Sequence, residues 1–174
     1  MKFQIKKGKH YSPSLKFGIH FGITKLEKTA TLYESCYYEL NNIDDLDENK
    51  LFGFTYDFFG NNSLRISWNV RTDAKTKKRF ICLYGYCHLN GVRLMPKTLN
   101  GHTIGINYNF NEPIQCSIEL DNGIAYFKAS QHGYSGEQKL IKIGFPISPS
   151  WGYYQRPYFG GNQPAPHNME IEII

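Results

Sequence analysis

The sequence has little that would place the protein in a membrane or in a helical fold. No stretch approaches the roughly 20 apolar residues of a membrane-spanning helix, so no membrane partner is expected. Few segments have the Ala, Leu, Glu and Lys composition typical of helices. No apolar run follows the basic N-terminus, so the sequence predicts no signal peptide and a cytoplasmic or virion-associated protein.

Close cysteine and histidine spacings are also absent. Cys36, Cys82, Cys87 and Cys116 lie in strand-like runs without the spacing of a disulfide framework, which predicts buried thiols in a reducing compartment. The histidines form no HxH or HExxH motif. Cys82 and Cys87 are five positions apart and would face opposite sides of a strand, so they cannot share one zinc ion. No metal site and no cofactor are therefore predicted.

Positive charge is present but not concentrated. The 174 residues carry a net charge of +5, and the basic residues between 73 and 79 have the composition of a solvated hairpin turn. Nucleic-acid binding would need a focused basic face with stacking aromatic residues, so it is not expected. The length suits one domain, 1–174.

Aromatic residues and turn formers dominate instead. The chain is 16% aromatic, with 13 Tyr, 12 Phe, 16 Gly and 8 Pro, which favours short strands joined by turns. Leu64–Arg71 alternates apolar and polar residues, as a half-buried strand does, and Arg79–Leu89 is apolar on both faces. Asn90-Gly91 and Asn122-Gly123 are hairpin-turn signals.

Further strands are expected along most of the chain, with one short helix near 42–50 that begins at an Asn cap and an acidic first turn. The pattern predicts an all-β fold, an antiparallel two-sheet β-sandwich of the jelly-roll, concanavalin A-like type. The further strands are Lys2–Lys6, Lys16–Ile23, Thr29–Tyr38, Val92–Met95, Thr103–Phe110, Pro113–Leu120, Ile124–Ala129, Gln138–Ile143 and Met169–Ile174.

Several short motifs resemble one group of known proteins. They are Ser63-Leu-Arg-Ile-Ser-Trp68, Leu83-Tyr-Gly-Tyr86 with Asn90-Gly-Val-Arg93, and Tyr158-Phe-Gly-Gly161 with Pro164-Ala-Pro-His167. In this order they resemble small uncharacterised proteins of bacteria and phages with concanavalin A-like or laminin-G-like jelly rolls. The resemblance covers about Leu51 to Ile174. It implies the fold and transfers no catalytic residue.

Three candidate groups for chemistry have weak patterns. Asp44, Asp45, Asp47 and Glu48 could offer oxygen ligands to a structural calcium ion, but an acidic helix start explains them better. Glu170 and Glu172 share one face of the last strand, the type of pair that glycosidases use, yet any strand with one wet face shows this pattern.

A third group has the residue types of polysaccharide lyases with this fold, which use His, Tyr and Arg on one sheet. Its members would be Arg65, Arg71, Tyr84, Tyr86 and His88. Inward and outward facings are expected to be mixed, with the tyrosines packing in the sheet and the arginines solvated on its outer side. No catalytic residue is therefore predicted.

The strongest binding candidate is the aromatic segment Trp151–His167. Its glycines and prolines predict a stiff loop, which could either bind a ligand or close one end of the sandwich. Phe159 and His167 are expected to be structural. Aromatic rings and neighbouring polar groups suit sugar or protein recognition. The predicted ligand-binding residues are Trp151, Tyr153, Tyr154, Arg156, Tyr158 and Asn162.

The sequence thus favours a non-catalytic binding module, with a glycan as the preferred ligand and a protein as the other partner. One alternative is a structural or interaction protein, such as a phage virion decoration or assembly component, and a homo-oligomer would suit it. A second alternative is a carbohydrate-active hydrolase or lyase.

Overall fold

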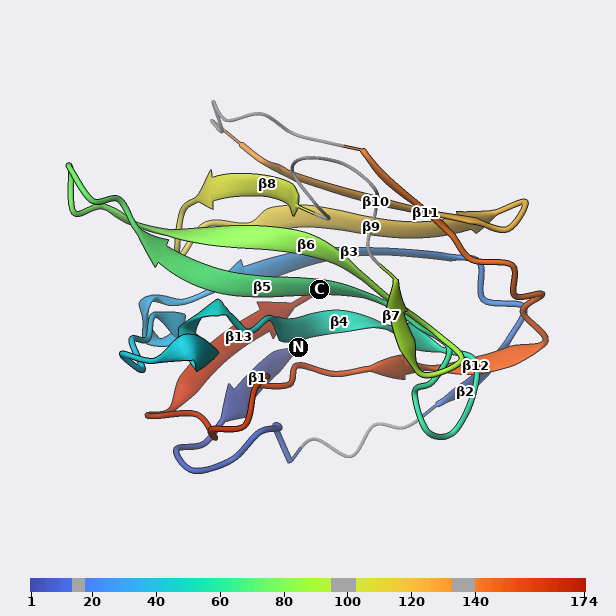
Figure 1. Cartoon of the computed structure of the whole chain (residues 1–174), viewed down its shortest axis with the longest axis horizontal. Coiled ribbons are helices and arrows are strands. Elements are labelled where there is room, and N and C mark those ends of the chain that lie inside the picture. Colours follow the sequence, from blue (N-terminus) through green and yellow to red (C-terminus); the bar gives the residue numbers. More distant parts are fainter. Residues whose placement is uncertain (14–17, 95–102, 133–139) are drawn as a thin grey trace.

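The protein is a sandwich of two antiparallel β-sheets, seen in a computed structural model that describes residues 1–13, 18–94, 103–132 and 140–174 (Figure 1). The predicted all-β two-sheet fold is confirmed. Sheet A has the order β1-β13-β3-β9-β10-β11, and sheet B has the order β2-β12-β4-β5-β6-β7 with β8 also paired to β6. Sheet A contains β1 (Lys2–Ile5), β3 (Lys25–Leu32), β9 (Ile114–Asp121), β10 (Ile124–Gln131), β11 (Ile141–Gly144) and β13 (Met169–Ile173). Sheet B contains β2 (Ile19–Phe21), β4 (Asn49–Thr55), β5 (Ser63–Thr72), β6 (Arg79–Leu89), β7 (Val92–Leu94), β8 (Thr103–Tyr108) and β12 (Trp151–Gln155).

The hydrophobic core lies between the two sheets, and alternation along each strand decides which side chains enter it. In β5 the apolar residues Leu64, Ile66 and Trp68 are fully buried in this core, as the alternating pattern predicts. Phe127 of β10 reaches Gly85 of β6 from the opposite sheet, so closely that a Cβ atom at Gly85 would lie 2.8 Å from its ring. Burial of each such large apolar side chain stabilises the fold by roughly 1.5–3 kcal/mol.

Both predicted hairpin turns are present. Asn90 and Gly91 have φ angles of 52° and 77°, and Asn122 and Gly123 have φ angles of 47° and 74°. Two successive positive φ values define the type I′ turn that matches the twist of antiparallel strands. The basic segment between β5 and β6 is also a turn, held by the Asp73 carboxylate.

The region near 42–50 differs from its predicted helix. Only a 3₁₀ helix forms there (Ile43–Leu46), and another forms at Glu34–Cys36 where the strand Thr29–Tyr38 was expected to continue. The expected Asn cap exists, since the Asn42 side chain accepts a hydrogen bond from the Asp44 amide. The helix stays short because the segment from Asn49 joins sheet B, where Asn49 pairs with Trp68.

The start of the aromatic segment is the largest correction to the predicted fold. Trp151–Gln155 was expected to be a loop, but it forms β12 and pairs with both β2 and β4. A glycine weakens a strand by its propensity, yet Gly152 permits this pairing: a Cβ atom there would lie 2.4 Å from the Thr55 carbonyl oxygen.

Three predicted strands lie partly outside the described residues. The strands Lys16–Ile23 and Gln138–Ile143 do so at their starts, and the strand Val92–Met95 does so at its end. Among the residues that are described, no helix has the length and apolar character needed to cross a membrane.

Candidate functional site

The outer face of sheet B carries buried polar side chains, which is unusual for a face directed away from the core. Because Leu64, Ile66 and Trp68 point inward, Arg65 and Ser67 of β5 must point outward. These outward positions are nonetheless well covered. Glu48, Thr55, Ser63, Ser67 and Asn69 are all buried.

The strand register brings side chains from four strands together on this face. Residues directly opposite each other in neighbouring strands share a face of the sheet. Arg65 pairs with Tyr86 and Ser63 pairs with His88. Lys50 pairs with Ser67, and Arg93 pairs with His88. We call the resulting group the polar cluster, defined as Glu48, Lys50, Arg65, Ser67, Tyr86, His88 and Arg93.

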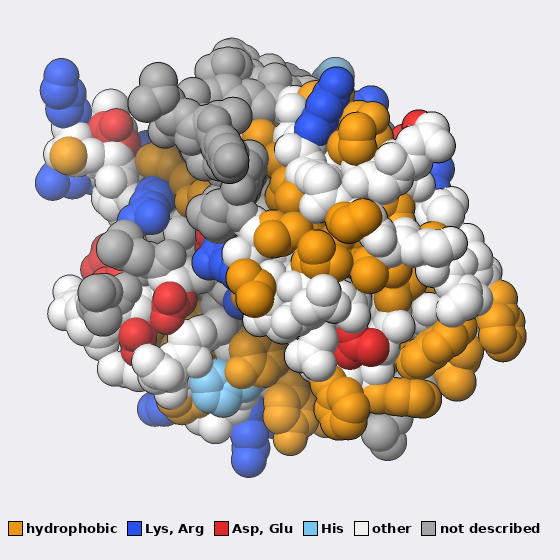
Figure 2. All heavy atoms as spheres, turned by 45° about the vertical axis from the view of Figure 1, so that its right-hand side comes forward, with side chains coloured by type: hydrophobic (Ala, Val, Ile, Leu, Met, Phe, Trp, Pro, Cys, Tyr) orange, Lys and Arg blue, Asp and Glu red, His pale blue; other side chains and the backbone are white. Residues whose placement is uncertain are grey.

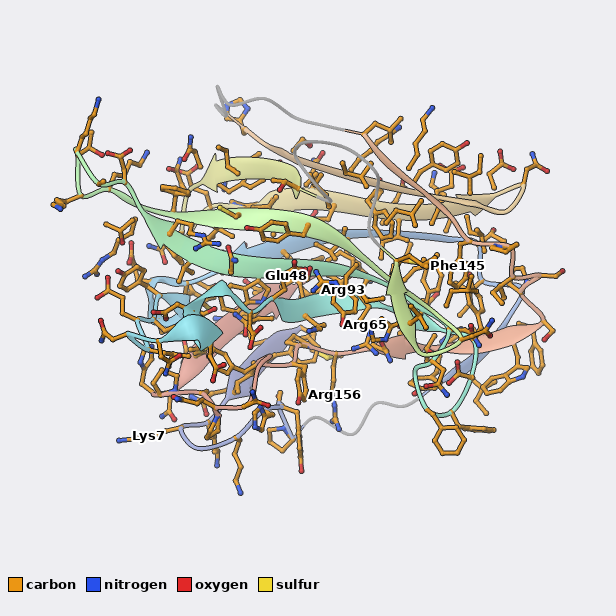
Figure 3. All side chains as sticks on the ribbon, viewed as in Figure 1. Lys7, Glu48, Arg65, Arg93, Phe145 and Arg156 are labelled. Carbon is orange, nitrogen blue, oxygen red and sulfur yellow. The ribbon has the colours of Figure 1, made fainter. Side chains whose placement is uncertain are left out.

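Glu48 connects the cluster. Its side chain is 8% exposed, and its Oε2 accepts a 2.5 Å hydrogen bond from the Ser67 hydroxyl. Its Oε1 accepts a 2.5 Å charge-assisted hydrogen bond from Nη2 of Arg93. Such bonds are roughly twice as strong as neutral ones. In Figure 3, Glu48, Arg93 and Arg65 lie near one another over β4 and β5, whereas Lys7 lies apart.

Tyr86 lies among cations. The Lys50 ammonium is 4.4 Å and the Arg93 guanidinium carbon 4.6 Å from the centre of its ring, both cation–π distances. The Tyr86 hydroxyl is 3.0 Å from Nε2 of His88. Burial lowers the pKa of His88, and the positive charges of Arg65 and Lys50 add to the shift, so its imidazole is neutral near pH 7.

Arg65 is the least satisfied member of the cluster. Burial lowers the pKa of its guanidinium, and its buried Nε has no hydrogen-bond partner. The side chain lies across Gly53, where a Cβ atom would be 2.9 Å from Cγ of Arg65. Gln155 of β12 pairs with Gly53 from the other side, and its buried Oε1 also lacks a partner. Unsatisfied buried polar atoms cost free energy and are rare in native folds, so these two atoms on the outer face of sheet B are candidates to contact a ligand.

Aromatic rings lie beside the cluster on β12, which pairs with β4. Trp151 and Tyr153 alternate with Gly152 on β12, and Trp151 packs on Phe58 with ring centres 4.7 Å apart. The Tyr153 hydroxyl donates to the Phe58 carbonyl. Figure 2 shows hydrophobic side chains gathered at the lower right of this side of the molecule. We call this group the aromatic patch, defined as Ile19, Phe21, Phe58, Phe59, Trp151 and Tyr153.

The structure separates the six residues predicted to bind a ligand. Trp151 and Tyr153 are half-buried on the outer face of sheet B. Tyr158 joins them, because its backbone pairs with Lys50. These three residues therefore border the polar cluster.

The other three predicted residues lie elsewhere. Tyr154 points to the opposite side of β12, where it packs on His20 and lines a cavity of about 480 Å³ together with Arg156. Arg156 also lies over the ring of Tyr11. Asn162 is exposed in the bend after Gly161.

Phe159 and His167 have the structural roles expected of them. Phe159 is buried in the core, with its ring against Tyr38. Nε2 of His167 lies 2.9 Å from the Ser35 carbonyl oxygen.

The polar cluster corrects the expectation of mixed facings on β5 and β6. Arg65 and Arg71 share the outer face with Tyr84, Tyr86 and His88, as the register shows. Arg65 was predicted to be solvated, but neighbouring side chains bury most of it. Alternation within each strand already implied a common face, but the relative register of β5 and β6 was needed to align the two strands. Lys50 and Arg93 were not identified as site residues, and Glu48 was grouped with the possible calcium ligands, since all three lie in segments outside β5 and β6.

The remaining candidate groups do not gather into a site. All four cysteines are buried and free, as predicted. Asp45 accepts hydrogen bonds from the backbone of Leu40 and Asn41, whereas Glu48 turns to the polar cluster. No group of three or more potential metal ligands occurs within 1–13, 18–94, 103–132 and 140–174. Glu170 and Glu172 share the outer side of β13, which belongs to sheet A, the other sheet.

Gly160 of the aromatic segment packs closely against Glu48 and Asn49, and its replacement is expected to destabilise the fold. The Gly160 amide donates a 2.8 Å hydrogen bond to the Asn49 side chain, and a Cβ atom there would lie 2.4 Å from the Glu48 carbonyl oxygen. Gly160→Ala should lower the free energy of unfolding by about 1–3 kcal/mol, the usual cost of overpacking. Urea denaturation measures this. Gly144→Ala is the matched control, since no atom lies within 4 Å of the added carbon; equal losses in both variants would contradict the expectation.

Comparisons with known proteins support the fold alone. No family model and no curated protein matches the sequence. A functionally unknown protein from Saccharomyces cerevisiae is structurally similar, with a TM-score of 0.52 at 10% identity over 99% of this chain and 86% of that chain. The exoplasmic/lumenal domain of VIP36 gives a TM-score of 0.42 at 10% identity in its Ca²⁺/Man3GlcNAc-bound form, over 98% of this chain and 77% of that chain. The Ca²⁺/Man2-bound form of the same domain gives a TM-score of 0.40 at 11% identity, over 100% of this chain and 79% of that chain.

Proposed function

We propose that the protein is a non-catalytic glycan-binding module and that the ligand lies on the outer face of sheet B. The observation that carries this proposal is the continuity of two surfaces. Half-buried aromatic rings on β12 lie beside the polar cluster, and Gln155 of β12 and Arg65 of the cluster flank Gly53 from opposite sides.

Sugars need both kinds of surface. A sugar ring has apolar faces that pack on aromatic rings and hydroxyl groups that both donate and accept hydrogen bonds. Trp151 and Tyr153 supply rings that are already held by contacts to Phe58. Ordered rings lose little conformational freedom on binding, which favours affinity.

The test measures glycan binding with and without one of these rings. On a glycan array and then by calorimetry, Tyr153→Ala should bind the best ligand about tenfold more weakly, equivalent to about 1.4 kcal/mol. Tyr126→Ala is the control, because Tyr126 lies on the outer side of sheet A beside Lys142. Absence of any glycan ligand for the native protein, or equal binding by both variants, would refute the proposal.

A structural or interaction protein is the second candidate, and the aromatic patch favours it. Phe21 and Phe59 are 83% and 87% exposed, and large exposed apolar groups mark protein contacts as well as ligand sites. Self-association through the patch would appear as a dimer or larger species in light scattering. The double variant Phe21→Ser/Phe59→Ser should then be monomeric.

Cleavage of the bound glycan is the third candidate. It is favoured by the hydrogen bond between Tyr86 and the neutral His88, which lie beside Arg65. A neutral imidazole can act as a general base. Incubation of the protein with each bound glycan, followed by chromatography, separates this candidate from binding alone: shorter products show cleavage and an unchanged glycan shows none.

A further inference from the structure

We propose that Arg65 and Lys50 bind the anionic group of an acidic glycan, either a uronate carboxylate or a sulfate ester. This inference rests on the proposed function, which it narrows from glycans in general to those with negative charge. It follows from the charges on the outer face of sheet B and from how they are partnered.

Two carboxylates near these cations, those of Glu48 and Asp57, are already engaged, whereas Asp47 acts on Lys50 only through its charge and forms none of the described ion pairs. Both oxygens of Glu48 bind Ser67 and Arg93. Asp57 accepts hydrogen bonds from three backbone amides of its own loop, those of Phe59, Asn61 and Asn62. Within the described part of the chain, the ion pairs are Lys25 with Glu27 and Arg93 with Glu48, and neither includes Arg65 or Lys50.

Arg65 has the geometry to receive an anion. Its guanidinium is a planar fork of donors that matches a carboxylate or a sulfate with two parallel hydrogen bonds. It is largely buried with no ion-pair partner among the described residues, an arrangement that costs free energy until an anion is present. Gly53 lets β5 and the Arg65 side chain lie close against β4, since a Cβ atom there would be 2.1 Å from the Leu64 carbonyl oxygen and 2.9 Å from Cγ of Arg65.

Lys50 is a second cation on the same face. Its ammonium donates a 2.7 Å hydrogen bond to the Glu48 carbonyl oxygen and lies over the Tyr86 ring. Burial lowers its pKa to about 8, although Glu48 opposes this shift, and the charges of Arg65 and Arg93 lower it further. A bound anion would reverse these effects, because an opposite charge favours the protonated form.

One substitution should therefore affect stability and binding in opposite directions. Replacing a buried charge that lacks a partner by an apolar residue of similar size removes the desolvation cost. Arg65→Met should raise the melting temperature by about 2–4 °C in the absence of ligand. The same variant should lose its preference for acidic glycans. A purely structural arginine would show a lower melting temperature instead.

The experiment uses matched pairs of tetrasaccharides, each a uronate and its carboxyl-reduced neutral counterpart, in the gluco, manno and galacto configurations. A third member of each set carries a sulfate ester on the neutral chain. Calorimetry with the native protein should show at least tenfold tighter binding of an acidic member than of its neutral counterpart. Arg65→Met and Lys50→Gln should each reduce the ratio of acidic to neutral glycan affinity at least threefold. Arg79→Met, at an exposed arginine over the Tyr37 ring, should leave it unchanged.

The outcomes separate the inference from the proposed function. Preference for the uronate or for the sulfate ester supports the inference and identifies the anionic group. Equal binding of acidic and neutral members overturns it and leaves glycan binding intact. Absence of binding to every member and to the array overturns both. If Arg65→Met melts at a lower temperature than the native protein, the Lys50→Gln variant still tests the inference. An unchanged ratio of acidic to neutral glycan affinity in Lys50→Gln contradicts it.

Discussion

Replacing Phe159 by alanine is expected to lower the free energy of unfolding by about 3–5 kcal/mol. The Phe159 side chain is 1% exposed and its ring meets the edge of Tyr38 at a centre-to-centre distance of 4.9 Å. Its amide also donates a 2.6 Å hydrogen bond to the His10 carbonyl. Loss of the ring would leave a cavity where β4, the N-terminal segment and the aromatic segment meet. The transfer and cavity contributions therefore add.

Phe59→Ala is the matched control for this prediction. Phe59 is 87% exposed, so its removal should change the free energy of unfolding by no more than about 0.5 kcal/mol. Urea denaturation followed by tryptophan fluorescence measures both variants, because Trp68 lies in the core. A loss below 1 kcal/mol in Phe159→Ala would show that the segment does not depend on this ring.

Removing the carboxylate of Glu48 is expected to lower the free energy of unfolding by about 3 kcal/mol. Breaking a buried ion pair costs 3–5 kcal/mol, and the lower end applies because Arg93 is 36% exposed. Glu48→Ala would leave the Ser67 hydroxyl and the Arg93 guanidinium without this acceptor. It would also leave Lys50, Arg65 and Arg93 to repel one another.

The chain offers a natural control, because the other ion pair among the described residues is exposed. Glu27→Ala removes the carboxylate that pairs with Lys25 and should cost less than about 1 kcal/mol. A double-mutant cycle with Arg93→Ala isolates the interaction: the double variant should lose less than the sum of the two single losses. Additive losses would mean that Glu48 stabilises the fold without Arg93, through the Ser67 hydrogen bond and packing.

Local patterns in the sequence predicted much of the fold. The alternation along Leu64–Arg71 and the two Asn-Gly turns depend on residues close together in the chain, and the structure agrees with them. β12 was missed because its partners β2 and β4 lie far away in sequence. Gly152 contributes to that error, since it weakens a strand by local propensity and is required by close pairing.

The candidate site could be predicted only in part for the same reason. Trp151, Tyr153 and Tyr158 occur within one segment, so their composition marked them. Glu48, Arg65 and Arg93 come from three separate segments and meet only through the pairing of β4, β5, β6 and β7. A single sequence shows which face a residue has within its own strand, but not how far the next strand is shifted.

The pairing of β1 with β13 has a consequence for how the chain folds. In the described structure, β1 (Lys2–Ile5) is an edge strand of sheet A. It pairs there only with β13 (Met169–Ile173), which in turn pairs with β3. During synthesis on the ribosome, β1 must wait for β13 to emerge before the two can pair. Contacts between such distant segments slow folding, since a long loop must close before they form. The edge of β3 that β13 covers stays open until β13 has been synthesised, and an open edge of this kind is a place where a nascent chain needs protection from aggregation.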